Sequence, residues 1–167
     1  MFVVRKAHSL WLLATIGLIV AACGILPETL VWLQEVDFEV DPKANNGNAF
    51  SCHIVVACSN DLCMRLQTMD AKGYFQATTS LEKTYKDSIE IFKIDLVPGR
   101  DRKGYRVDIK SRTKAKAAFL FAKYLTPGKF MENVGVSNRI TVRFLPNKME
   151  VHHNIDLEAL TKKLGNG

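Results

Sequence analysis

The stretch EVDFEV, residues 35–40, decides the fold of this chain, because acidic and apolar residues alternate along it without a break. In an extended chain Val36, Phe38 and Val40 fall on one face and the acidic residues fall on the other. This alternation is typical of a strand that packs one face on a hydrophobic core and turns the other to solvent. We therefore predict a strand within residues 29–40.

Segments of similar character recur along the chain and are separated by turn-forming residues. Their ranges are 49–57, 88–97, 105–109, 114–125, 139–145 and 149–153. Residues 114–125 have a composition that also suits a helix, but the Pro-Gly pair that bounds them and their aromatic content favour a buried strand. The charged residues 100–104 are expected to form a turn.

Helical spacing interrupts the strands once. Leucines after Ala57 predict a helix that begins near Asn60, with Asp61 as its N-cap, followed by a second short helix from Asp70. Residues 156–164 are expected to form a terminal helix.

Together these elements predict a mainly β fold. No long helices alternate with the strands, which argues against a doubly wound sheet. We expect one antiparallel β-sandwich over residues 30–167, with a short helical insert and a C-terminal helix.

The composition excludes several classes of protein. The chain has 167 residues, of which 47% are hydrophobic and 24% are charged, so it is neither disordered nor fibrous. The net charge is +6, but the basic residues are spread along the sequence with acidic residues between them. A nucleic-acid-binding protein usually concentrates its basic residues on one surface. No nucleophile elbow, phosphate-binding glycine loop or zinc-protease motif occurs. We expect no catalytic residue, cofactor, metal or small-molecule substrate.

The N-terminus has the pattern of a secretory leader. Arg5 and Lys6 precede the apolar residues 10–22, which end in small residues directly before Cys23. The sequence Val-Ala-Ala-Cys resembles the lipobox of bacterial lipoproteins, which implies a signal peptide over residues 1–22, acylation of Cys23 and a short tether over residues 23–29. The residue after Cys23 is not Asp, which in lipoproteins implies sorting to the outer membrane. The alternative is an uncleaved single-span anchor.

Three more cysteines would lie in an oxidising compartment, where disulfides persist. Cys58 and Cys63 flank a short polar turn and are the disulfide candidates, whereas Cys52 and Cys58 would be too far apart on one extended strand. The alternatives are three buried free thiols, or a zinc site that borrows a ligand from His53 or the histidines at 152 and 153.

The acylated cysteine and the small sandwich together resemble the TssJ family of outer-membrane lipoproteins of type VI secretion. The matching features are the Asn- and Gly-bearing loop at 41–48, the apolar strand at 50–57, the Leu-rich insert at 62–75, the Leu-Val-Pro-Gly turn at 96–99 and the Ala-Lys-Tyr ending at 122–124. The resemblance implies a transthyretin-like sandwich that binds the periplasmic domain of an inner-membrane, TssM-like partner.

The resemblance places partner binding in the loop after the first strand. Its residues are Asp41, Pro42, Lys43, Ala44, Asn45, Asn46, Gly47 and Asn48. The alternative is a plain solvated turn, because surface turns have this composition. For the whole chain, the alternatives are an assembly lipoprotein of another secretion system, such as a type IV pilotin, and a periplasmic enzyme or ligand-binding protein.

Overall fold

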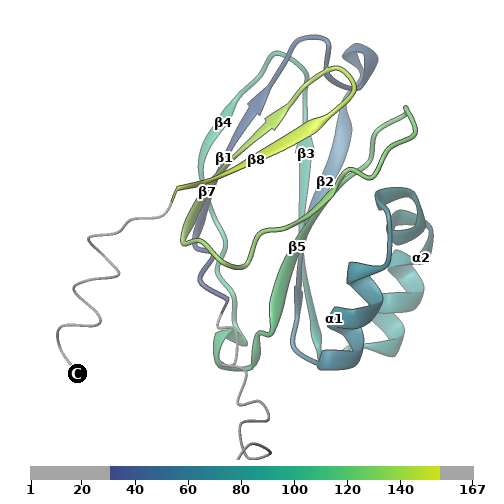
Figure 1. Ribbon diagram of the computed structural model, residues 1–167, viewed down its shortest axis with the longest axis vertical. Helices are drawn as coiled ribbons and strands as arrows, with labels where there is room; N and C mark the ends of the chain where they lie inside the picture. Colours follow the sequence, from purple (N-terminus) through teal and green to yellow (C-terminus); the bar gives the residue numbers. More distant parts are fainter. Residues whose placement is uncertain (1–30, 155–167) are drawn as a thin grey trace, which may run out of the picture.

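The computed structural model describes residues 31–154, which form a β-sandwich with two helices on one outer face (Figure 1). The strands are β1 (Glu35–Val40), β2 (Phe50–Ala57), β3 (Ile89–Leu96), β4 (Arg102–Arg106), β5 (Ala117–Ala122), β6 (Met131–Asn133), β7 (Arg139–Phe144) and β8 (Met149–Asn154). The helices are α1 (Asn60–Gln67) and α2 (Ala71–Thr84), with short 3-10 turns η1 (Ala44–Gly47) and η2 (Arg112–Lys114). The expected mainly β sandwich with a helical insert is confirmed. Cys23 and the expected terminal helix lie outside the described residues.

The strands form two sheets of four, in the orders β4-β1-β7-β8 and β3-β2-β5-β6. Neighbouring strands are antiparallel except β1 and β7, which run parallel with Glu35 opposite Arg139 and Val40 opposite Phe144. This parallel pair was not predicted, because residues about a hundred positions apart in the sequence carry no local sign of pairing.

Aromatic side chains join the two sheets. Phe144 of β7 lies edge-on to Phe50 of β2, with ring centroids 5.1 Å apart, and it stacks beside Phe38 of β1 at 6.2 Å. All three side chains are at most 5% exposed. Because aromatic rings bury the largest apolar areas, this cluster is a major part of the sandwich core.

The helices cover the outer face of the second sheet (Figure 1). Tyr74 of α2 stacks on Phe121 of β5, with ring centroids 4.1 Å apart, and its hydroxyl lies 3.0 Å from the ring nitrogen Nδ1 of His53 on β2. Every residue of β5 is buried, because one face meets the other sheet and the opposite face meets α2. This double burial explains the continuous apolar sequence at 117–122 and confirms the predicted buried strand.

Strand β4 differs from its prediction. It covers Arg102–Arg106 rather than residues 105–109, so part of the expected charged turn is strand. The cause is a bulge opposite β1, where Gly104, at φ 65°, donates its N–H to the carboxylate of Asp37 at 2.7 Å. That bond lowers the pKa of Asp37, and so does a hydrogen bond from Arg139 at 2.9 Å. Asp37 is only 7% exposed. The register of β4 therefore depends on a contact that local alternation does not encode.

The helix starts are set by side-chain caps. Ser59, not Asp61, caps α1 by accepting the N–H of Leu62 at 3.3 Å. Asp70 caps α2, which begins where the second helix was predicted. The predicted cap at Asp61 was wrong because the N-cap lies two residues earlier, at Ser59, and Ser is as good an N-cap as Asp. The short strand β6 had no counterpart among the predicted elements.

Candidate partner interface

Residues 41–48 connect β1 to β2 and contain the 3-10 turn η1. Asn45, Asn46 and Gly47 take the left-handed backbone conformation, with φ of 49°, 57° and 76°. Glycine and asparagine adopt this conformation at the lowest cost. The Asn-Asn-Gly sequence therefore accounts for the shape of the loop.

Two residues of this loop are structural. Ala44 is buried, and Asn45 is only 2% exposed. The Asn45 side chain donates from Nδ2 to the carbonyl of Asn48 at 3.1 Å, and its Oδ1 accepts the backbone N–H of Leu125 at 2.6 Å. Ala44 and Asn45 therefore do not belong to the exposed surface of the loop, because the loop folds back onto the segment after β5.

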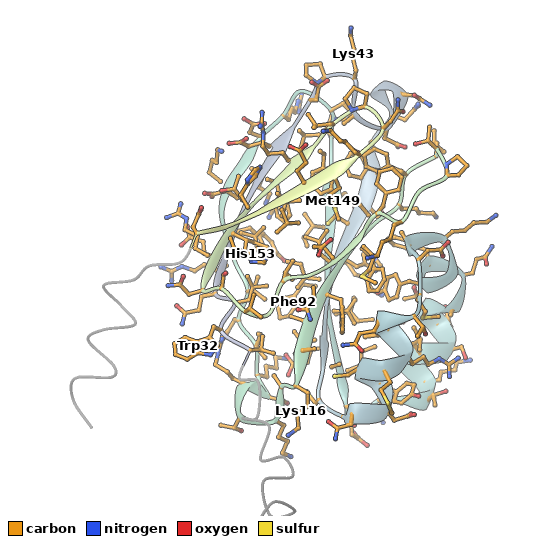
Figure 2. The ribbon with its side chains drawn as sticks, viewed as in Figure 1. Trp32, Lys43, Phe92, Lys116, Met149 and His153 are labelled. Atoms are coloured by element: carbon orange, nitrogen blue, oxygen red, sulfur yellow. The ribbon has the colours of Figure 1, made fainter. Side chains whose placement is uncertain are left out.

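The remaining residues give the loop its surface. Those exposed to solvent are Pro42, Lys43, Asn46, Gly47 and Asn48. Lys43 points away from the sandwich at its extreme end (Figure 2). The carboxylate of Asp41, which is partly buried, accepts the backbone N–H of Lys43 at 2.7 Å and so restrains the tip. A restrained polar loop of this kind presents its groups to a partner with little loss of conformational entropy on binding.

The strand directions bring four connections to the same end of the sandwich (Figure 1). They are residues 41–49, 97–101, 123–130 and 145–148. Gly99 donates its N–H to the carbonyl of Val40 at 2.9 Å, and the hydroxyl of Tyr124 donates to the carbonyl of Leu145 at 2.9 Å. We call this surface the loop end.

The described chain starts at the opposite end, which we call the tether end. Trp32 and Lys116 lie there, far from Lys43 (Figure 2). Arg112 holds the first residues in place, because its guanidinium donates to the carbonyls of Val31 at 3.2 Å and Leu33 at 3.1 Å. A chain that is anchored before residue 31 would thus hold the tether end towards the anchor and the loop end away from it. Within the described part of the chain, no helix has the length and apolar character needed to cross a membrane.

The cysteines Cys52, Cys58 and Cys63 are free thiols in the structure. Burial raises the pKa of all three thiols, most strongly that of Cys52. The neighbouring Cys58 also raises the pKa of Cys63, so these two lie close to each other where α1 begins. A Cys58–Cys63 bridge stays a prediction.

The three histidines of residues 31–154 do not form one cluster, because His53 lies on β2 and the other two lie on β8. Burial lowers the pKa of His53, which lies under α2, to about 4. His152 and His153 are exposed on β8, and His153 Nδ1 lies 3.0 Å from the hydroxyl of Ser137. Between residues 31 and 154 no three His, Cys, Asp or Glu side chains come together as a metal site would require.

Two positions matter more in the structure than the sequence suggested. Leu125 contacts the 41–48 loop through its backbone, and Arg112 binds the start of the described chain. The Pro-Gly pair after Leu125 was the only local sign of its loop, and Arg112 was hidden in a basic run that had the composition of a solvated surface.

Solved structures of type VI secretion proteins match this arrangement of strands and helices. Lip from Serratia marcescens, a membrane-bound component of the type VI secretion system, has a TM-score of 0.55 at 12% identity and covers 74% of this chain and 97% of its own. The type VI lipoprotein TssJ1 from Pseudomonas aeruginosa has a TM-score of 0.56 at 12% identity, and the match covers 72% of this chain and 94% of TssJ1. The chain has the TssJ fold.

A chain from a structure of a type VI membrane complex is also similar to this chain, with a TM-score of 0.53 at 16% identity, and the match covers 72% of this chain and 98% of that chain. No family model and no curated protein sequence matches the chain. The similarity to the TssJ family that the sequence motifs indicated is therefore confirmed in the fold.

Proposed function

We propose that this chain is a non-catalytic, lipid-anchored component of a type VI secretion membrane complex, which tethers a periplasmic partner to the outer membrane. The observation that carries the proposal is the separation of the two ends. Arg112 fixes the start of the described chain at the tether end, and the exposed tip at Lys43 lies at the loop end (Figure 2). A protein built in this way can hold a membrane at one end and a partner at the other.

The leader supports the membrane attachment. Cys23 is the proposed site of acylation, and only seven residues lie between it and Val31, so the two Cα atoms are eight Cα–Cα steps apart. A chain of this length spans at most about 28 Å when fully extended, so the tether end would stay close to the bilayer. Several acyl chains on one cysteine bind a membrane durably, because each buried methylene contributes about 0.8 kcal/mol.

The loop end supports the partner contact. Its proposed binding residues are the exposed ones, chiefly Pro42, Lys43 and residues 46–48, while Ala44 and Asn45 hold the loop in shape. The proposed partner is the periplasmic domain of an inner-membrane, TssM-like component. Attachment to the lipid and to the partner together would raise the effective concentration of each contact and make the assembly more durable than either alone.

Co-purification from membranes tests the proposal. Lys43→Glu should reduce recovery of the periplasmic partner domain at least about fivefold, since interfaces concentrate their binding energy in few residues. Lys110→Glu is the matched control, because Lys110 is also an exposed lysine but lies beside η2 at the tether end. Substitution is a more specific test than deletion of residues 43–47, which would also remove the buried Asn45.

The lipid anchor is tested at the proposed acylation site. Cys23→Ser should move the protein out of the membrane fraction and remove the acyl mass. Unchanged partner recovery from Lys43→Glu would refute the loop assignment, and an unchanged mass in Cys23→Ser would refute the lipid anchor.

A further inference from the structure

A cleft of about 430 Å³ lies at the loop end, between the first turns of α2 and the segment that follows β5. Phe75 of α2 lines one wall, and Tyr124, Leu125 and Phe130 line the other. The volume falls within the range of about 300–1,000 Å³ that is usual for clefts that bind ligands. It is therefore large enough to take side chains of a bound molecule.

The walls of the cleft are aromatic and fixed in place. Tyr124 stacks on Phe130 with ring centroids 4.1 Å apart, and its hydroxyl is held by the carbonyl of Leu145. Leu125 stands at the rim and is 68% exposed, the highest value among the large hydrophobic side chains of residues 31–154. Its backbone N–H donates to the Asn45 side chain, so the backbone that carries this exposed side chain is held in position. An exposed apolar side chain beside a rigid aromatic cleft is typical of a binding site.

The charges around the cleft favour an acidic occupant. Lys72 and Lys123 line it, and Lys129 is exposed on the same loop. Asp70 is the one acidic residue of the lining, and its carboxylate already accepts the N–H of Gly73 as the cap of α2. The lining therefore carries more lysine than acidic side chains, and its one carboxylate is already used as a helix cap. Carboxylates on a bound segment would supply the missing negative charge.

The cleft is continuous with the 41–48 loop. The hydrogen bond from Leu125 to the Asn45 side chain joins the two, and both belong to the loop end that points away from Val31.

We propose that this cleft binds an extended segment of the partner protein, in which large apolar side chains are flanked by acidic residues. The proposal rests on the proposed function, since it adds a second contact to the same partner at the same end. The apolar side chain would enter between Phe75 and Leu125, and the carboxylates would meet Lys72 and Lys123. The alternative occupants are a basic peptide and a small apolar molecule. Tighter binding of the basic peptide would favour the first, and equal binding of acidic and basic peptides would favour the second.

Peptide binding to the full chain in detergent tests the cleft without the partner. The probe is a fluorescently labelled peptide with the sequence Glu-Asp-Phe-Glu-Leu-Asp-Glu, and its counterpart has every acidic residue replaced by lysine. We expect the acidic peptide to bind at least about fivefold more tightly than the basic one, and binding to weaken as salt is added. Leu125→Asp and Lys123→Glu should each weaken it at least about fivefold. Val136→Asp is the matched control, because Val136 is 66% exposed but lies in the connection between β6 and β7 at the tether end.

Several outcomes would overturn the cleft assignment. They are equal binding of the two peptides, no binding of the acidic peptide up to about millimolar concentration, and an equal loss from Val136→Asp. The partner assay separates this result from the proposed function. If wild-type protein recovers the partner domain and Leu125→Asp recovers it equally well, the cleft proposal fails alone. If the acidic peptide binds as expected but wild-type protein recovers no partner domain, the proposed function fails and the cleft remains a site for acidic peptides.

Discussion

The side chain of Asn45 holds the backbone of Leu125, with its Oδ1 accepting the Leu125 N–H at 2.6 Å. The two residues are eighty positions apart in the sequence. This bond joins the 41–48 loop to the wall of the cleft, and so the two proposed contact surfaces form one unit.

We predict that Asn45→Ala lowers the free energy of unfolding by about 2–4 kcal/mol. The variant loses the hydrogen bonds to Leu125 and Asn48 and places alanine at φ 49°, where an L residue is strained by roughly 1 kcal/mol. Urea denaturation measures the change. Asn45→Gly is the control, because glycine removes the strain but not the loss of hydrogen bonds, so it should be more stable than Asn45→Ala. Equal stability of the wild type and both variants would contradict the structural role of Asn45.

Acid should destabilise the protein through His53. Burial lowers the pKa of His53 to about 4, and its ordinary value in an unfolded chain is about 6.5. The unfolded state therefore takes up the proton first, so stability that is present above pH 6.5 is lost progressively as the pH falls towards 4. Each unit of pKa difference is worth about 1.4 kcal/mol, which gives a total of about 3 kcal/mol.

His53→Gln isolates this effect, because glutamine can still bond the Tyr74 hydroxyl but does not titrate. Carboxylates such as Asp37 titrate in both proteins, so the difference between the two stability curves measures His53 alone. We expect the wild type to lose more stability than His53→Gln between pH 7 and pH 4, as measured by denaturant unfolding at each pH. Parallel curves would show that His53 is not held neutral by the fold.

The sequence predicted the strands well where burial follows a simple rule. Alternation located β1, and continuous apolar character located β5, because the first has one buried face and the second has two. The parallel pairing of β1 with β7 and the shift of β4 were not predictable, since they depend on contacts between distant segments such as Gly104 and Asp37.

The candidate interface was predictable only in part. The Asn-Asn-Gly sequence marked the loop through its preference for the left-handed conformation, but burial of Asn45 depends on Leu125 and could not be read locally. The cleft was not predictable at all, because its walls come from α2 and from the segment after β5, which no periodic pattern connects.

The predicted bridge between Cys58 and Cys63 can be tested directly by alkylation of the free thiols. If it forms in the exported protein, alkylation under denaturing, non-reducing conditions should modify Cys52 but neither of the other two thiols. Prior reduction should make all three reactive, as peptide mass spectrometry would show. Cys63→Ser is the control, because it should free Cys58 for alkylation without reduction. Modification of all three thiols in unreduced protein would establish that they stay free, as they are in the structure.

Arg112 should determine how firmly the tether end is held. Its guanidinium donates to the carbonyls of Val31, Leu33 and Val107, and a planar group with several donors can serve all three at once. Arg112→Met should lower the free energy of unfolding by about 2–3 kcal/mol, because buried carbonyl groups lose their partners. Hydrogen exchange in residues 31–34 should quicken by more than exchange in β2. Arg112→Lys keeps the charge but loses the planar group of several donors. Its unfolding free energy and its exchange rates should therefore lie between those of the wild type and Arg112→Met. If Arg112→Lys matched the wild type in both measurements, charge alone would account for the contact and the geometry of the guanidinium would not matter.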